Sequence, residues 1–273
     1  MSLLQVSNLR IWDGITGNVF VPNSSFELKP GSCLAIVGES GSGKSLTCKA
    51  IMRLNTRTIR QSGDILFNGV RLNQLTEEEM RRRRGKQLYL ILQNGMRAFD
   101  PTSVIGVHLR ETLLHHFGWS RSEIVDKMTQ AMQIVKLKDP VEIMNKYPHQ
   151  LSGGMLQRIM IALAIVLEPA IIIADEPTSA LDTVSKYEVV EQFVRLRENM
   201  GCSIIFVSHD LGTVRKLADE VLVMRNGSIV ERGDTSVVFS AAQHAYTRFL
   251  VSSHSSLNEH FKRVTGGPVY VNC

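Results

Sequence analysis

The sequence has no long hydrophobic run, which argues against any membrane-spanning helix. Its longest unbroken apolar stretch is Ile159–Leu167, nine residues. Nine helical residues reach roughly 13 Å, whereas the hydrocarbon core of a bilayer is about 30 Å thick. The first residues, Met-Ser-Leu-Leu-Gln-Val, lack the basic segment and the cleavage site of a secretory signal, so no signal peptide is expected.

Cysteine is scarce and scattered. The four cysteines, Cys33, Cys48, Cys202 and Cys273, form no C-x-x-C pair and show no metal-ligand spacing. This argues against a disulfide framework or a zinc site and predicts reduced thiols, three of them filling the core. His115 and His116 are adjacent, but neighbouring residues on a helix point in different directions, so they predict a surface pair and not a metal site.

Internal repeats, coiled-coil heptads and low-complexity tracts are also missing, and the composition is that of an ordinary globular protein. The chain has 273 residues, of which 44% are hydrophobic and 21% charged. That length allows one large domain or two small ones with a packed core. The net charge of +5 predicts only weak attraction to anionic surfaces.

One glycine-rich stretch, Gly38-Glu-Ser-Gly-Ser-Gly-Lys-Ser45, organises the rest of the sequence. It fits the phosphate-loop pattern G-x-x-x-x-G-K-[ST], and it stands between a predicted strand (33–37) and a predicted helix (44–54). Such a turn directs successive backbone N–H groups to one point at the positive end of the helix dipole. Glycine is needed because a Cβ would block both the turn and the approach of phosphate.

The stretch therefore predicts a nucleoside triphosphate site. Lys44 would bind the β- and γ-phosphates, and the Ser45 hydroxyl would ligate Mg²⁺. The predicted nucleotide-binding residues here are Gly38, Glu39, Ser40, Gly41, Ser42, Gly43, Lys44, Ser45 and Leu46.

Apolar patterning predicts an α/β fold. Strands are expected at residues 4–11, 25–29, 33–37, 63–69, 88–92, 170–174 and 203–207, with a hairpin at 221–231. Helices are expected at residues 76–85, 104–117, 122–137, 154–167 and 183–200. The pattern is helical from about 94 to 168, which predicts a helical subdomain inserted into a core of 1–93 and 169–251. Residues 252–273 are expected to form a short, loosely ordered tail.

Four arginines end the helix predicted at Thr76–Gly85. They could form a nucleic-acid patch, but basic residues that complement the helix dipole at a solvated helix end are the simpler interpretation.

Polar residues follow three of the apolar strands. Asp175 and Glu176 follow 170–174, Gln93 follows 88–92, and His209 follows 203–207. Carboxyl ends of parallel strands meet at one edge of the sheet, so these side chains are expected beside the phosphate loop. There Asp175 could hold Mg²⁺, and Glu176 could orient or deprotonate water. Gln93 could complete the Mg²⁺ shell or position water. The alternatives are exposed acids at a strand end and a structural histidine.

A different segment, Leu151-Ser-Gly-Gly-Met-Leu-Gln-Arg158, opens a predicted helix away from that edge. Ser152 is a good N-cap, and Gly153 and Gly154 leave backbone N–H groups open to an anion. An ordinary helix start is the alternative, but the helix that follows is very apolar and the segment ends in Gln157-Arg158.

In their order, these motifs resemble the ATP-binding subunit of an ABC transporter. The resemblance covers residues 1 to about 250, and the wording of 151–158 is highly specific to that superfamily. More narrowly, residues 37–45, 175–182 and 208–212 resemble the oligopeptide, dipeptide and nickel importer branch. Residues 244–250 resemble the C-terminal helix of that branch, and Gly43–Cys48 is closest in wording to its nickel-importer members.

The resemblance implies the fold and the residue roles. The expected fold has a P-loop NTPase core with a mainly parallel sheet, an antiparallel β subdomain and an inserted helical subdomain. The implied Mg²⁺ ligands are Ser45, Gln93 and Asp175. The implied catalytic residues are Glu176 as general base, His209 as γ-phosphate sensor, Gln93 and Lys44. Ser152, Gly153 and Gly154 would bind the γ-phosphate of the opposite subunit, and Asp182 would form a contact across the dimer. Trp12 would stack on adenine, with Phe20 as the less favoured candidate.

The sequence departs from the family pattern in three places. The segment after Gln93 is looser than usual, Leu156 replaces a frequent basic residue, and the tail lacks the cysteine cluster of some peptide-importer ATPases. The last departure predicts that no iron–sulfur centre is present.

The resemblance finally implies a function. The chain would be the ATPase of an importer for nickel, cobalt or a metal–chelator complex, with peptide import as the alternative. It would lie on the cytoplasmic face of the membrane, bind permease subunits and a second ATPase or its own copy, and act indirectly with a solute-binding protein, without nucleic acid. A soluble ABC ATPase of DNA repair or translation is the rival from another class. Such proteins usually carry two cassettes, long coiled coils or zinc motifs, and this sequence has none of these.

Overall fold

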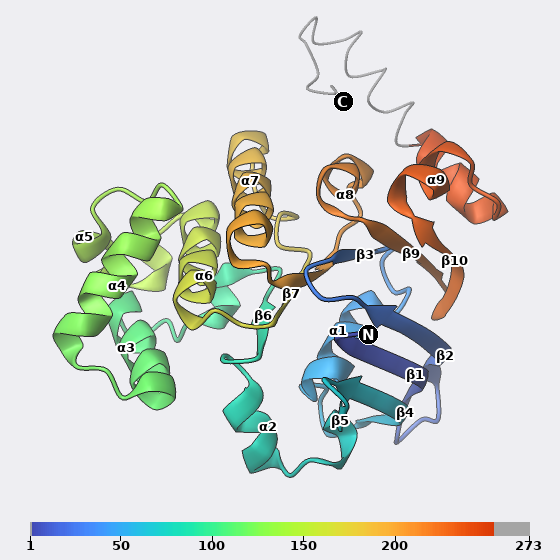
Figure 1. Cartoon of the computed structure of the whole chain (residues 1–273), viewed down its shortest axis with the longest axis horizontal. Coiled ribbons are helices and arrows are strands. Elements are labelled where there is room, and N and C mark those ends of the chain that lie inside the picture. Colours follow the sequence, from blue (N-terminus) through green and yellow to red (C-terminus); the bar gives the residue numbers. More distant parts are fainter. Residues whose placement is uncertain (1, 254–273) are drawn as a thin grey trace, which may run out of the picture.

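The computed structural model describes residues 2–253, and these fold around two sheets. The smaller sheet is antiparallel, in the order β2-β1-β4-β5. Its strands are β1 (Leu4–Asp13), β2 (Val19–Leu28), β4 (Ile59–Phe67) and β5 (Val70–Arg71). In Figure 1 this sheet lies at the lower right of the molecule.

The larger sheet has six strands in the order β10-β9-β3-β8-β7-β6. They are β3 (Cys33–Val37), β6 (Leu88–Ile91), β7 (Ile171–Asp175), β8 (Ser203–Val207), β9 (Glu220–Arg225) and β10 (Ser228–Asp234). Neighbours from β9 to β6 pair in parallel, and β10 is antiparallel to β9. Strands β3, β7 and β8 are buried along their whole length.

Both faces of the larger sheet are covered, which explains why these strands are apolar throughout. On β8, Ile204 and Phe206 belong to one core with the helical region, whereas Ile205 and Val207 belong to a second core with the smaller sheet. This is the period-two alternation of a strand, with both faces buried. Each fully buried Ile or Phe contributes roughly 1.5–3 kcal/mol to folding.

Between β6 and β7 the chain is helical, as Figure 1 shows at the left of the view. The helices there are η2 (Gly95–Ala98), α3 (Ile105–Phe117), α4 (Arg121–Ile134), α5 (Pro140–Met144), η3 (Pro148–Gln150) and α6 (Gly153–Leu167). Ser120 starts α4 with a capping box to Glu123. The most apolar helix is α6, whose residues Ile159, Ile161, Ala162 and Ala164 are fully buried.

The remaining helices flank the two sheets. They are α1 (Lys44–Met52), η1 (Leu72–Gln74), α2 (Glu77–Arg83), α7 (Thr183–Met200), α8 (Leu211–Leu217) and α9 (Thr235–Ser240). Residues 245–253 are also helical.

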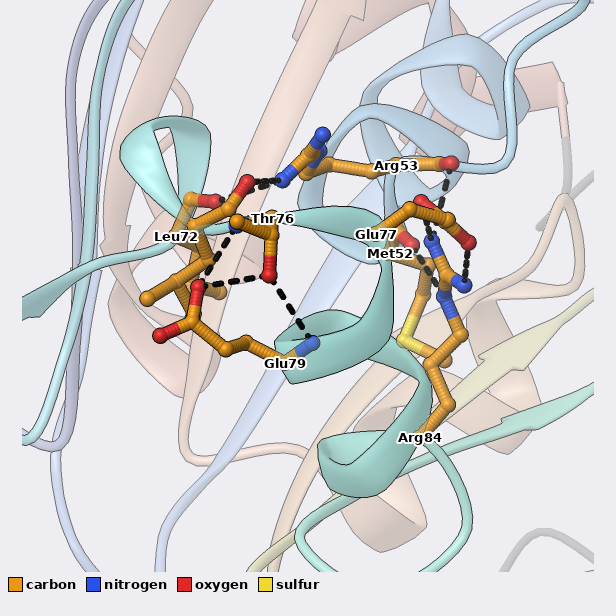
Figure 2. Close-up of polar contacts among 8 residues, drawn as sticks. Met52, Arg53, Leu72, Thr76, Glu77, Glu79 and Arg84 are labelled. Atoms are coloured by element: carbon orange, nitrogen blue, oxygen red, sulfur yellow. Dashed lines mark hydrogen bonds and ion pairs between the residues drawn. The ribbon is translucent and has the colours of Figure 1, made fainter.

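Helix α2 and the end of α1 are joined by an arginine clasp, drawn in Figure 2. Thr76 starts α2 with the capping box that its sequence predicts, since Thr76 and Glu79 exchange two hydrogen bonds. At the other end, Arg84 donates to the carbonyl oxygens of Met52 at 2.8 Å and Arg53 at 3.2 Å, and pairs with Glu77 at 2.5 Å. These carbonyls belong to the C-terminal end of α1, where no intrahelical donor can reach them.

The interpretation of the four arginines as a solvated helix end is therefore wrong for one of them. It holds for Arg82, because Arg82 and its partner Glu78 are both 74% exposed. Arg84 is only 17% exposed and acts as a structural link to α1.

Some of the observed elements differ in length from those predicted. The first strand runs to Asp13 and so includes Trp12, and the second begins at Val19 and not at 25. Helices α5, α8 and α9 were not expected. Cys33, Cys48 and Cys202 are buried, as predicted. Of the tail predicted at 252–273, residues 252 and 253 still belong to the helix that begins at 245, and residues 254–273, with Cys273, lie outside the described residues. Among the residues that the structure describes, no helix is both long and apolar enough to cross a membrane.

Candidate nucleotide-binding and hydrolysis site

The glycine-rich loop joins β3 to α1 at the carboxyl edge of the larger sheet. Lys44 folds back over it, and its Nζ donates to the carbonyl oxygens of Gly38 and Glu39, both at 2.8 Å. Lys44 is 5% exposed, and this burial lowers the pKa of its ammonium group, although nearby carboxylates oppose the shift. A sheltered, hydrogen-bonded cation thus lies within the loop, as recognition of phosphate requires.

Two glycines of the loop are required by close contacts. A Cβ at Gly38 would lie 2.1 Å from the carbonyl oxygen of Met224 in β9. Gly43 has a φ of 96°, and a Cβ there would lie 2.8 Å from Cγ2 of Val21 in β2. The loop is also tied to the β9–β10 turn, because Gly227 N–H donates to the Ser42 carbonyl at 3.2 Å. The phosphate loop is therefore packed between both sheets.

The side-chain oxygen atoms of Ser45 and Asp175 lie side by side. Asp175 ends β7 and is 6% exposed, and the Ser45 hydroxyl donates to its Oδ1 at 2.8 Å. Burial raises the pKa of Asp175, while the hydrogen bond from Ser45 acts in the opposite direction. A buried carboxylate beside a hydroxyl is the donor set that Mg²⁺ prefers, so these two residues fit that ion.

Glu176, Gln93 and His209 meet at one oxygen. Gln93 Nε2 donates to Glu176 Oε2 at 3.2 Å, and His209 Nδ1 lies 3.4 Å from the same atom. The three residues follow β6, β7 and β8, so parallel pairing of these strands brings them together. In this arrangement the amide nitrogen of Gln93, and not its oxygen, faces Glu176.

The backbone of Glu176 turns sharply. Its N–H still bonds the Val207 carbonyl at 3.0 Å, but its φ is 47°, and Pro177 follows. A left-handed φ at a non-glycine residue costs roughly 1–3 kcal/mol and is typical of functional sites. The turn directs the chain away from the sheet and leaves the carboxylate, 19% exposed, at the shared edge.

A small cavity of about 90 Å³ lies next to this group. Glu176, Ser179, Leu181 and His209 are among its lining residues, and Lys186 and Asp210 form an ion pair in its wall. Asp182, the predicted contact across a dimer, caps α7 by accepting from the N–H groups of Val184 and Ser185.

The glycines of the segment 151–158 lie at the start of α6. Ser152 is the N-cap and accepts from the N–H of Met155 at 3.2 Å. At Gly154 a Cβ would lie 3.0 Å from Ser185 Oγ, so any larger residue is crowded. Within residues 2–253, no hydrogen bond or ion pair joins Ser152, Gly153 or Gly154 to the phosphate loop.

Gln157 ties the same segment to the chain just before Gln93, through a contact that the sequence analysis did not predict. Gln157 is 1% exposed, and its Nε2 donates to the Leu92 carbonyl at 3.1 Å, directly before Gln93. The sequence did carry a signal for this contact, because a single amide side chain within a very apolar helix is buried and needs a hydrogen-bond partner. Leu156, which stands where the family often has a basic residue, is fully buried in the helical core.

The two aromatic candidates lie on the smaller sheet. Trp12 pairs with Val19 and Arg60, and the guanidinium of Arg10 lies 5.5 Å from its ring centre. The backbone of Phe20 lies against the β9–β10 turn, since a Cβ at Gly227 would lie 2.0 Å from the Phe20 carbonyl, and Gly227 in turn bonds Ser42 of the phosphate loop.

Comparisons with known proteins agree with this geometry. The sequence profile of the ABC transporter family matches residues 21–179. The metal-staphylopine import system ATP-binding protein CntD of Staphylococcus aureus is 44% identical over 270 residues, which is 99% of this chain and 100% of the relative. The dipeptide transport ATP-binding protein DppD of Lactococcus lactis is 41% identical over 270 residues, with 97% of this chain and 77% of the relative covered.

Among solved structures, an ATP-binding cassette in a dimeric, post-hydrolysis state with ADP and phosphate matches with a TM-score of 0.75. The match covers 85% of this chain and 98% of that one at 24% identity, which supports the fold alone. The α/β P-loop fold expected from the sequence is confirmed. From the match to its sequence profile and the similarity to these relatives, the chain belongs to the ABC transporter family, as an ATP-hydrolysing importer subunit.

Proposed function

We propose that this ATPase powers the uptake of a transition metal bound to a small organic chelator. The observation that carries the proposal is the 44% identity to CntD over 99% of this chain and 100% of that relative. Peptide import is the second candidate, favoured by the 41% identity to DppD. We place metal–chelate import first because the match to CntD spans the whole relative, whereas the match to DppD covers 77% of it.

We assign the binding of ATP to the phosphate loop. The ammonium of Lys44 would leave the carbonyls of Gly38 and Glu39 for the β- and γ-phosphates, and the loop N–H groups would bind the remaining phosphate oxygens. Trp12 would stack on adenine, with Phe20 as the alternative.

Ser45 and Asp175 would hold Mg²⁺, and a rotation of the Gln93 amide would add its oxygen. When bound, this ion supplies charge neutralisation for the phosphates. The support is the buried pair of oxygen atoms at 2.8 Å.

Hydrolysis would rest on Glu176. Its carboxylate accepts a proton from the water that attacks the γ-phosphorus, while the bond from that phosphorus to the bridging oxygen breaks and ADP leaves. His209 lies 3.4 Å from the carboxylate and would sense the γ-phosphate. Both groups come from the ends of rigid, buried strands, which suits precise positioning.

The glycine-lined start of α6 would serve a second subunit. The N–H groups of Ser152, Gly153 and Gly154 lie at the N-terminus of α6, and within residues 2–253 these residues make no hydrogen bond or ion pair with the phosphate loop of their own chain. We therefore infer that they bind the γ-phosphate on a partner ATPase, either a similar chain or a second copy. The chain would act as a peripheral protein on the cytoplasmic face of the membrane, bound to permease subunits. A solute-binding protein would deliver the cargo to the permease.

A transport assay tests the proposed cargo. Cells that lack this gene should lose uptake of radiolabelled nickel or cobalt supplied with the cognate chelator, while uptake of labelled di- and oligopeptides stays unchanged. Complementation with the wild-type gene, but not with Glu176→Gln, should restore uptake. Lost peptide uptake with normal metal content would overturn the cargo and leave the ATPase assignment intact.

A further inference from the structure

The C-terminal helix, residues 245–253, packs beside the strand that leads into the phosphate loop. Its Tyr246 is 4% exposed and belongs to a small core with Ala35 and Val37 of β3 and Val223 of β9. The family motifs of this chain assign this tyrosine no role in the ATP site. Its position nevertheless places a polar atom against the loop.

The hydroxyl of Tyr246 is hydrogen-bonded to the loop backbone. The N–H of Glu39 donates to Tyr246 Oη at 3.0 Å. That N–H belongs to the Gly38–Glu39 peptide, whose carbonyl oxygen accepts from Lys44 Nζ at 2.8 Å. The peptide is thus held at both ends, while its α-carbon at Gly38 lies too close to Met224 O to admit a side chain.

The tyrosine itself is firmly placed. The guanidinium of Arg225 lies 4.8 Å from its ring centre, and His244 Nδ1 accepts its backbone N–H at 3.1 Å. Glu231 on β10 accepts from the backbone N–H groups of Gln243 at 2.7 Å and His244 at 3.0 Å. These contacts fix the start of the helix, so the hydroxyl has little freedom to follow a displaced loop.

We propose that Tyr246 is a positioning residue for ATP binding, which holds the Gly38–Glu39 peptide in the orientation that the phosphates require. Without the hydroxyl, the Glu39 N–H loses a partly buried hydrogen-bond partner, and the loop relaxes into other orientations. ATP binding must then restore the binding-competent orientation, which lowers affinity. Tyr246 itself touches no phosphate.

Tyr246→Phe isolates the hydroxyl, because the ring and its contact with Arg225 remain. In a titration of the purified full-length chain with a fluorescent ATP analogue and Mg²⁺, we expect Kd to rise about five- to tenfold. This corresponds to about 1.0–1.4 kcal/mol. In the assembled transporter the KM for ATP should rise by a similar factor, with kcat within twofold of wild type.

Tyr89→Phe is the matched control. The Tyr89 hydroxyl is also buried and donates to a backbone carbonyl, that of Met160, at 3.1 Å, but it lies under the helical region. It should cost similar stability in thermal unfolding and leave the Kd for ATP unchanged. Phe249→Ala, at a 59% exposed position on the same helix, should also leave it unchanged.

An affinity of Tyr246→Phe within twofold of wild type, or tighter than wild type, would overturn the proposal. So would an equal loss of affinity in Tyr89→Phe, because the effect would then follow stability alone. Since the measurement is nucleotide affinity, its result is independent of which cargo the transporter carries.

Discussion

His209 Nδ1 lies 3.4 Å from Glu176 Oε2, although the two residues follow different strands. Their exposures differ sharply, because 63% of the histidine side chain is exposed but only 19% of the glutamate side chain. The carboxylate is therefore sheltered by the sheet edge, whereas the imidazole faces outward. A sheltered carboxylate with an exposed partner suits a site where the nucleotide arrives from the open side.

Replacing Glu176 with Gln should abolish turnover and spare binding. The amide keeps the shape of the side chain and removes the proton acceptor, so phosphate release should fall at least about 100-fold, the usual contribution of a general base. ATP affinity, measured with a fluorescent analogue, should stay within twofold. Glu198→Gln, on an exposed part of α7, is the control. Hydrolysis within threefold of wild type would show that Glu176 is not the base.

Replacing Lys44 with Ala should act on binding itself. The ammonium is buried within the loop and bonded to its carbonyl oxygens, so its loss should weaken ATP affinity by more than about tenfold, a change of about 1.4 kcal/mol. Lys138→Ala, an exposed lysine in the helical region, should leave affinity unchanged. Titration of both variants separates a site effect from a general loss of positive charge.

Asp175→Asn should stabilise the free chain while it inactivates the enzyme. Burial raises the pKa of Asp175 in the folded state, so the folded chain holds this proton more tightly than the unfolded chain does. Stability from this group is then present at low pH and is lost as pH rises through the folded pKa. Asparagine can still accept from Ser45 but carries no charge.

The thermal midpoint of Asp175→Asn, measured without nucleotide or Mg²⁺, should therefore exceed that of wild type at pH 8. The difference should shrink as the pH falls toward 4. A variant that is less stable than wild type at pH 8 would contradict the sign of the shift.

Arg84→Ala should destabilise the fold by roughly 2 kcal/mol, since hydrogen bonds that involve a charged group contribute about 1.5–3 kcal/mol. The change removes four hydrogen bonds, one each to Met52 and Arg53 and two to Glu77, and leaves α1 carbonyls without their donor. Arg82→Ala, which breaks an exposed pair, should change stability by less than about 0.5 kcal/mol. Urea unfolding of both variants gives the comparison, and equal effects would refute the clasp.

The sequence predicted the site well where one topological rule applied. Ser45 and Asp175 are 130 positions apart, yet both follow apolar strands of a parallel sheet, and such ends share an edge. No comparable rule relates Glu39 to Tyr246 across 207 positions, because that contact depends on how a helix packs at the end of the chain.

The fold was harder to predict where periodicity is weak. Helices α5, α8 and α9 have only five to seven residues, too few to show a period of 3.6. On the smaller sheet, the register of β1 against β4 shifts between Ser7 and Arg10, at Asn8 with a φ of 52°. The pairing of β1 with β2 shifts register at three places between Val6 and Trp12, and such irregular pairing weakens the alternation that marks a strand, so β2 was predicted to begin at 25 and not at Val19.

The strand order also decides when the ATP site can form during synthesis. Strand β3 carries the phosphate loop, but its neighbours in the sheet are β8 and β9, and Gly31 bonds Ser203 across 172 positions. At about 5–20 residues per second, a ribosome needs roughly 10–35 s to add that stretch. During this time β3 has neither of its partners and exposes a wholly apolar segment. A nascent chain of this protein should therefore depend on chaperones until β9 emerges, and premature termination before that point should yield aggregates and no ATP-binding fragment.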